Sequence, residues 1–178
     1  MIRSMIGSSA FALSMVAGAA QATPYSIPVG TDPVTMKFDL PSLDIESQGP
    51  EGPGGFQFLA RSGNLVISLH SRPPTQDCPN AKTDEELGQC FYDRLPLDPG
   101  IYRPSIQTFL WKKGGAGFIY VVKAPPGQGS TTTMNTHKLL VKNGKYIDFH
   151  VSVVDATKEE MRTTATLIDQ VEFVDLVK

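Results

Sequence analysis

Residues 133–154 read TMNTHKLLVKNGKYIDFHVSVV and contain the strongest hairpin signal of the chain. Their Asn143-Gly144 pair is the preferred sequence for a two-residue turn between antiparallel strands, because both positions adopt positive φ in that turn. A turn of this length also sets the register of the two flanking strands, 133–141 and 146–154. The segment therefore predicts an antiparallel sheet with a defined cross-strand pairing.

The predicted register sorts the side chains of this hairpin onto two faces, because successive residues of a strand point in opposite directions. One face of the second strand is apolar throughout and is expected to face the core, with Ile147, Phe149, Val151 and Val153. The other face is mixed. It carries the cross-strand pairs Val141 with Tyr146, Leu139 with Asp148, His137 with His150, and Asn135 with Ser152.

The pair His137 and His150 is the sharpest functional candidate in the sequence. Residues directly opposite on antiparallel strands have Cβ atoms about 5 Å apart, so two imidazoles could share a metal ion, with Asp148 as a diagonal oxygen ligand. Against this interpretation, the sequence provides no third or fourth ligand nearby and no His-x-x-x-His spacing. The alternative is a polar pair at the surface or under a helix, with His150 hydrogen-bonded to Ser152 or Asp148.

Apolar residues that alternate with polar ones predict further strands on both sides of this hairpin. Met36, Phe38 and Leu40 show this period of two, and Pro41 ends the strand. The Gly- and Pro-rich residues 48–55 are expected to form a loop. Further strands are expected at 56–61 and 65–71, which flank Ser62-Gly63-Asn64, at 106–111 and 118–124, and at 171–174.

Two capping boxes mark the starts of two helices. In each, a Thr is followed three residues later by a Glu, so that the side chain of each residue accepts a hydrogen bond from the backbone N–H of the other. The two pairs are Thr83 with Glu86 and Thr157 with Glu160. The carboxylates of the first turns favour the positive ends of the helix dipoles. The expected buried stripes are Leu87, Cys90, Phe91 and Leu95 in the first helix, and Met161, Ala165 and Ile168 in the second.

These elements predict a β-rich α+β fold, an antiparallel β-sheet with two packed α-helices. A single domain is expected at residues 34–178. Residues 23–33 are polar and Pro-bearing, and are expected to be an extended lead-in with little structure of their own.

Residues 1–22 are interpreted as a cleavable signal peptide. Arg3 provides the positive charge, an uncharged apolar run follows, and Ala20-Gln21-Ala22 has the small-x-small form of a cleavage site. A membrane-spanning or buried helix is the alternative, but the run contains several serines and glycines. Because no Cys lies near the cleavage point for acylation, the mature chain is expected to be free of a stable membrane anchor, and periplasmic or else extracellular.

The mature chain contains two cysteines, Cys78 and Cys90, and an oxidising compartment favours a disulfide between them. A loop of this size gives a stabilisation of about 3 kcal/mol on the chain-entropy account. Two free thiols or a redox pair are the alternatives. Eleven residues separate the cysteines, whereas a redox motif has two between them.

Charge and motifs exclude several classes of function. The chain has a formal net charge of −2, and loss of Arg3 with the leader leaves −3. Lys112-Lys113 is the only adjacent basic pair, so no nucleic-acid partner is expected. No Gly-x-Ser-x-Gly elbow occurs, no cofactor is expected, and the chain is interpreted as a non-enzyme.

Two other features suggest binding surfaces. Trp111 and Tyr120 lie in predicted strands near a glycine-rich turn, where they either form a recognition patch or pack in the core. The Thr-rich residues 130–133 are either an exposed strand entry that pairs with a partner by edge addition or an ordinary loop.

The order of elements resembles that of the Mog1/PsbP/DcrB-like superfamily. Residues 56–71, residues 135–154 and the helix that begins at Thr157 carry the likeness, which covers roughly half to two-thirds of the mature chain and contains no invariant motif. The resemblance implies an antiparallel sheet with packed helices, and an accessory or binding role rather than catalysis. DcrB is a lipoprotein, however, and this chain has no cysteine to acylate. No functional residue is carried over, because the family offers no motif to match.

The leading hypothesis is an exported, small, non-enzymatic binding or accessory protein whose partner is an unknown protein or small ligand of the envelope. One form of it is an inhibitor or immunity-type protein that neutralises a toxin delivered to the envelope. The alternative is an exported metal-dependent or hydrolytic enzyme that uses His137 and His150.

Overall fold

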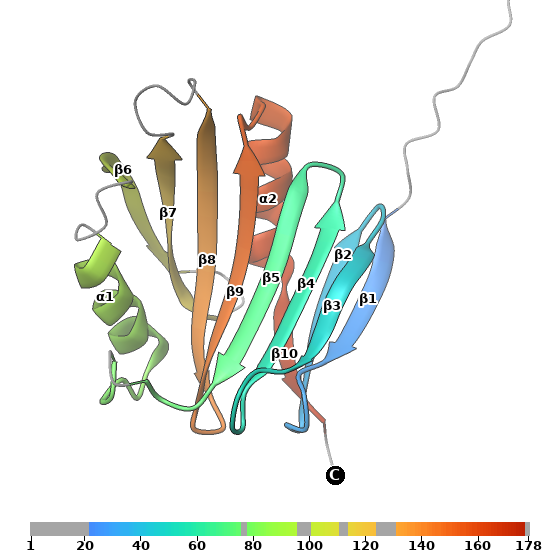
Figure 1. Ribbon diagram of the computed structural model, residues 1–178, viewed down its shortest axis with the longest axis vertical. Helices are drawn as coiled ribbons and strands as arrows, with labels where there is room; N and C mark the ends of the chain where they lie inside the picture. Colours follow the sequence, from blue (N-terminus) through green and yellow to red (C-terminus); the bar gives the residue numbers. More distant parts are fainter. Residues whose placement is uncertain (1–21, 76–77, 96–100, 111–113, 124–130, 177–178) are drawn as a thin grey trace, which may run out of the picture.

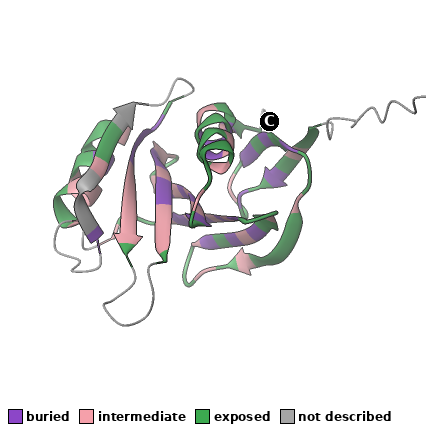
Figure 2. Ribbon diagram, turned by 90° about the horizontal axis from the view of Figure 1, so that it is seen from above, coloured by how far each residue is buried: buried purple, intermediate pink, exposed green. Residues whose placement is uncertain are grey.

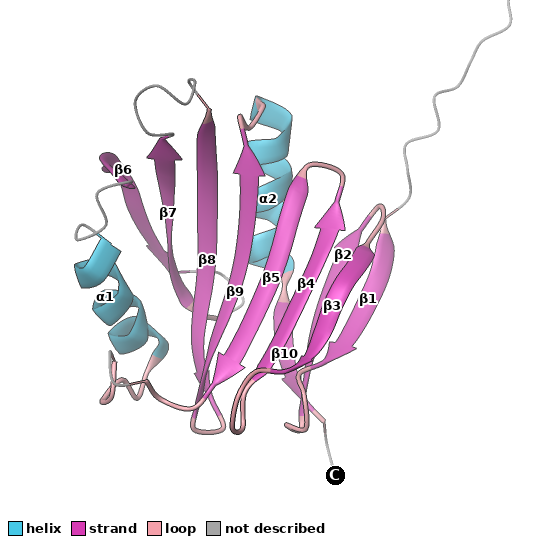
Figure 3. Ribbon diagram, viewed as in Figure 1, coloured by secondary structure: helices cyan, strands magenta, loops and turns pink. Residues whose placement is uncertain are grey.

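The computed structural model describes residues 22–75, 78–95, 101–110, 114–123 and 131–176. This part of the chain contains ten strands and two helices (Figure 3). All strand pairs are antiparallel and form two sheets, one of three strands and one of seven. The predicted β-rich α+β class is confirmed, but the strands form two sheets where one was predicted.

The seven-stranded sheet has the order β3-β4-β5-β9-β8-β7-β6. Its strands are β3 (Asp44–Pro50), β4 (Phe56–Ser62), β5 (Leu65–Arg72), β6 (Ile101–Leu110), β7 (Ala116–Lys123), β8 (Thr132–Lys142) and β9 (Lys145–Val154). The smaller sheet has the order β1-β2-β10, with β1 (Thr23–Pro28), β2 (Val34–Leu40) and β10 (Glu172–Asp175). The helices are α1 (Asp84–Arg94) and α2 (Lys158–Gln170).

The central hairpin β8–β9 has the predicted register. His137 pairs with His150, and the other cross-strand pairs also match the expectation. Asn143 and Gly144 have φ values of 52° and 72°, the positive values that the two-residue turn requires. The four residues expected to face the core, Ile147, Phe149, Val151 and Val153, are all buried.

The two faces of the seven-stranded sheet are covered by different elements. The three-stranded sheet and α2 pack on the face that carries Phe149, and together they enclose the main apolar core. Helix α1 packs on the opposite face, where Leu87 meets Phe118 and Leu139 in a smaller core. Figure 1 shows α1 beside β6–β8 and α2 behind β9 and β5. Figure 2 shows buried residues alternating with more exposed ones along the strands.

Both predicted capping boxes are present, with Thr83 and Thr157 as the N-caps. The predicted buried stripe of α2 is wrong in part, because Met161 and Ala165 are exposed. The buried residues of this helix are Thr164, Leu167 and Ile168. The chain leaves α2 through the fully buried Val171 into β10, and this exit sets which side of the helix faces the sheet.

Two segments expected to be irregular are strands instead. Residues 23–28 of the lead-in form β1, since Ile27 is buried and Tyr25 stacks on Phe38 with a centroid distance of 5.6 Å. The first residues of the loop predicted at 48–55 complete β3, with Pro50 opposite Phe56. An edge strand tolerates Gly and Pro, because only one of its sides has to pair.

A buried lysine joins the seven-stranded sheet to α2. Lys138 is fully buried, and its Nζ donates hydrogen bonds to the carbonyl oxygens of Ile168, at 3.3 Å, and Val171, at 2.9 Å. The carbonyls at the C-terminal end of a helix lack partners within the helix. The ammonium group therefore caps α2 from the neighbouring strand.

The predicted signal peptide, residues 1–22, lies outside the described residues except for Ala22. Within the described ranges, no helix has the length and apolar character that a bilayer crossing requires.

Candidate functional site

All three histidines of the chain lie on the α1-facing side of the seven-stranded sheet, on three adjacent strands. His137 on β8 faces His150 on β9, and His70 on β5 faces Asp148 on β9. We call these four residues the histidine cluster. The pair from the hairpin follows from local register, whereas His70 joins it through the pairing of β5 with β9.

His137 sits at the centre of a hydrogen-bonded chain. Its Nδ1 lies 2.8 Å from Asp148 Oδ1, and its Nε2 lies 3.4 Å from the Tyr120 hydroxyl. With the proton on Nδ1, the ring donates to the carboxylate and accepts from the phenol. The His137 and Asp148 side chains are 12% and 16% exposed. The chain of carboxylate, imidazole and phenol is thus largely screened from solvent.

His150 stacks on His137, with a centroid distance of 4.2 Å and an interplanar angle of 15°. Its Nε2 lies 3.0 Å from the side-chain oxygen of Asn135, and its Nδ1 lies 3.3 Å from the Ser68 hydroxyl. A neutral imidazole satisfies both contacts, as donor to Asn135 and acceptor from Ser68. Burial, followed by the charge of His137, lowers the pKa of His150 to about 3, so the ring is neutral near pH 7.

Asp148 keeps its charge despite its position. Burial alone would raise the pKa of this carboxyl group, but the charge and the hydrogen bond of His137, together with the charges of His150 and His70, lower it below its usual value. His70 has an acidic partner of its own, because its Nδ1 lies 2.8 Å from Glu51 Oε2. Together with Glu51, the histidine cluster therefore forms two carboxylate–imidazole pairs.

The stacked rings of His137 and His150 are poorly arranged to share a metal ion. An imidazole binds a metal through a lone pair in the plane of its ring, and nearly parallel stacked rings hold these lone pairs in separate parallel planes that do not meet at one ion. Both nitrogens of each ring also have neighbours within the protein. Across the described residues, no group of three or more His, Cys, Asp or Glu side chains is placed to hold a metal.

A cavity of about 340 Å³ lies between α1 and the seven-stranded sheet and borders the histidine cluster. We call it the α1 cavity. Most of its lining is apolar or aromatic, and Arg72, Arg94, Thr75 and Asp148 supply the charged and polar groups. The lining residues are Arg72, Thr75, Cys78, Leu87, Phe91, Arg94, Leu95, Ile101, Tyr120, Leu139, Tyr146, Ile147 and Asp148.

Several polar contacts hold α1 over the sheet. The Asp84 carboxylate accepts hydrogen bonds from the backbone N–H groups of Gly115, at 3.0 Å, and Val141, at 2.8 Å. The Tyr146 hydroxyl, from β9, donates to the Cys78 carbonyl oxygen. Asp84 thus does more than the favourable helix-dipole interaction expected from the sequence, because it joins the start of α1 to β8.

The predicted disulfide between Cys78 and Cys90 is present, with a Cα–Cα distance of 6.0 Å. It ties the segment before α1 to the middle of that helix. Cys78 lines the α1 cavity. The disulfide therefore supports one wall of the cavity.

Arg72 supplies a charged group to the lining of the α1 cavity. It is the last residue of β5, is half-buried and faces Tyr146 across the β5–β9 pair. Its guanidinium group makes no hydrogen bond or ion pair with any other described residue. By contrast, Arg61 on β4 pairs with Glu46.

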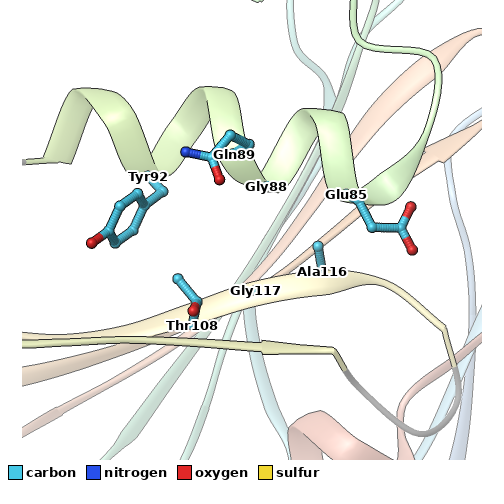
Figure 4. Close-up of a pocket in the computed structure, with 7 residues that line it drawn as sticks. All are labelled: Glu85, Gly88, Gln89, Tyr92, Thr108, Ala116 and Gly117. Atoms are coloured by element: carbon cyan, nitrogen blue, oxygen red, sulfur yellow. The ribbon is translucent and has the colours of Figure 1, made fainter.

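A second pocket, of about 270 Å³, lies on the other side of α1, between this helix and β6–β7 (Figure 4). Of its described lining residues, Glu85 alone is charged, and Gly88, Ala116 and Gly117 contribute little but backbone surface. A Cβ atom added at Gly88 would lie 2.6 Å from the Ala116 Cβ atom. This pocket marks the close approach of α1 to β7 and has no grouping of reactive side chains.

The structure bears differently on the binding residues that the sequence suggested. Tyr120 lines the α1 cavity and contacts His137, whereas Trp111 lies outside the described residues. Of the two alternatives for 130–133, edge addition is contradicted at Thr133, which is paired to both Val122 and Val154 inside the sheet; Ser130 lies outside the described residues. Arg72 and His70 were not predicted as site residues, since neither lies in a motif.

No protein-family model matches the chain, and no curated protein matches it in sequence. The likeness to the Mog1/PsbP/DcrB-like superfamily stays a prediction.

Proposed function

We propose that this chain is an exported, non-enzymatic binding protein that takes a small ligand into the α1 cavity. The single observation that carries the proposal is the cavity itself, a mostly apolar space with a few polar groups at one side. Small-molecule sites usually have this composition, and the volume lies at the lower end of their range.

The elements around the cavity support a preformed site. The disulfide and the Asp84 hydrogen bonds hold α1 in place without a ligand. A site that is ordered before binding avoids part of the entropic cost of association. The disulfide also suits a protein that acts in the periplasm or outside the cell, where thiols are oxidised.

A neutral fluorescent probe, N-phenyl-1-naphthylamine, tests the proposal. Its emission should rise on addition of the protein, because the probe would move from water into apolar surroundings. Leu95 is partly exposed and lines the cavity, so Leu95→Trp should fill the space and abolish the rise. Met161→Trp adds the same ring to the exposed side of α2 and should leave the signal unchanged. Equal emission from both variants would refute binding in the α1 cavity.

A hydrolytic enzyme is the second candidate, favoured by the hydrogen-bonded chain of Asp148, His137 and Tyr120. Two of these residues also line the cavity. In this reading His137 acts as a general base toward the Tyr120 hydroxyl, oriented by the carboxylate. Hydrolysis of p-nitrophenyl acetate that His137→Gln and Tyr120→Phe both abolish would support catalysis. Rates equal to that of buffer for the unaltered protein would argue for binding alone.

The metal form of the second candidate has its own test. Metal content of the purified protein and of a His137→Ala variant should differ if His137 is a ligand. Equal content near zero in both would remove that interpretation.

A further inference from the structure

We infer that the ligand of the α1 cavity is an apolar molecule with one carboxylate group, of the size of a medium-chain fatty acid or a small aromatic acid, and that Arg72 binds the carboxylate. This inference rests on the proposed function and adds the chemical class of the ligand.

The position of Arg72 carries the first step. A half-buried guanidinium group has lost part of its hydration, and protein partners normally replace it. Arg72 has no such partner among the described residues. A carboxylate matches the guanidinium group in charge and accepts two parallel hydrogen bonds from it. A ligand carboxylate at the cavity would supply the missing partner.

The charge balance of the cavity carries the second step. Among the described lining residues, Asp148 is the only acidic one, and its carboxylate is engaged by His137 at 2.8 Å. Two arginines, Arg72 and Arg94, line the same space. Because Arg72 has no partner among the described residues, the α1 cavity is complementary to one negative charge and unfavourable for a cationic ligand.

The other lining residues indicate that the part of the ligand beyond its carboxylate is apolar. Leu87 and Leu139 are fully buried, and Phe91 lies beside them in the same apolar cluster. These side chains offer no hydrogen bonds, so a polar body such as a sugar would lose its hydration without replacement. The volume of about 340 Å³ favours a short alkyl chain or a ring system over a long lipid tail.

Three ligands with the same alkyl chain separate the contributions of charge and apolar surface. Octanoate, 1-octanol and octylamine are each titrated at pH 7 against N-phenyl-1-naphthylamine bound to the protein. Octanoate should displace the probe at a concentration about tenfold or more below that of 1-octanol, because a hydrogen-bonded charge pair adds at least that factor. Octylamine should bind more weakly than either.

Two variants test the role of Arg72 itself. Arg72→Gln should remove the advantage of octanoate while 1-octanol binds as before, and Arg72→Lys should keep part of it through charge alone. Arg61→Gln is the matched control, because Arg61 lies on the same face of the sheet but does not line the cavity. The control should retain the full preference for octanoate.

The outcomes distinguish this inference from the proposed function. If 1-octanol or octylamine displaces the probe as well as octanoate does, the α1 cavity binds apolar ligands but the carboxylate assignment is overturned. The same holds if Arg72→Gln keeps the preference. If the probe never binds, the proposed function fails and the inference fails with it.

Discussion

His150 should make the stability of this protein sensitive to acid well above the range in which carboxylates titrate. Burial and the charge of His137 lower the pKa of this imidazole from 6.5 to about 3 in the folded state. Between these two values the unfolded chain takes up a proton that the folded chain does not. The free energy of unfolding must therefore fall as the pH falls through this window.

The size of the effect follows from one proton. A difference of one bound proton changes the free energy of unfolding by about 1.4 kcal/mol per pH unit. Because protonation of the unfolded chain begins only near 6.5, the loss between pH 7 and pH 5 amounts to about 2 kcal/mol. Asp148 adds little here, since its pKa lies below its ordinary value of 3.8.

Urea denaturation at pH 7, 6 and 5 measures this loss, with His150→Gln as the comparison. Glutamine offers an amide to Ser68 and Asn135 but does not titrate. Other groups contribute equally to both proteins, so the unaltered protein should lose about 2 kcal/mol more than the variant between pH 7 and pH 5. Parallel losses in the two proteins would show that His150 titrates normally in the folded state, which would refute the reasoning.

Three further predictions concern stability. Replacement of both Cys78 and Cys90 by Ser should lower the free energy of unfolding by about 3 kcal/mol, because their sequence separation of 12 closes a short loop; a matching loss on reduction of the unaltered protein checks this. Lys138→Met should cost about 2–4 kcal/mol in chemical denaturation, since two buried carbonyls at the end of α2 lose their donor, and unchanged stability would rule out the cap. Gly88→Ala should displace α1 and lower the melting temperature, and adding Ala116→Gly should restore it, because the two Cβ atoms would lie 2.6 Å apart; no recovery in the double variant would contradict this packing.

The features predicted correctly from the sequence depend on neighbours along the chain. Asn143-Gly144 determines a turn whose geometry needs only two residues, and that turn places His137 opposite His150. The caps at Thr83 and Thr157 involve residues three positions apart. Each of these signals is complete within one short segment, so no knowledge of the rest of the molecule was required.

The features that were missed depend on contacts between distant segments. The lead-in is a strand because β2 pairs with it, and β2 also pairs with β10 near the other end of the chain. Likewise, the sequence predicted only the pairing of β8 with β9. β8 is an interior strand because β7 pairs with its other edge. Strands pair through backbone N–H and C=O groups, and every residue except proline has both. The sequence of a strand therefore does not indicate which distant strand it pairs with.

The candidate site also contains features predicted from local sequence and features that depend on distant contacts. The sequence by itself determined the His137–His150 pair, the disulfide cysteines and the start of α1, because turn geometry, thiol chemistry and helix capping are local. Only the tertiary structure places His70 opposite Asp148, Arg72 at the lining of an apolar cavity and the Tyr120 hydroxyl next to His137. These contacts arise when β5 pairs with β9 and α1 packs on the sheet. The free energy that favours this arrangement comes from the burial of apolar surface over the whole core.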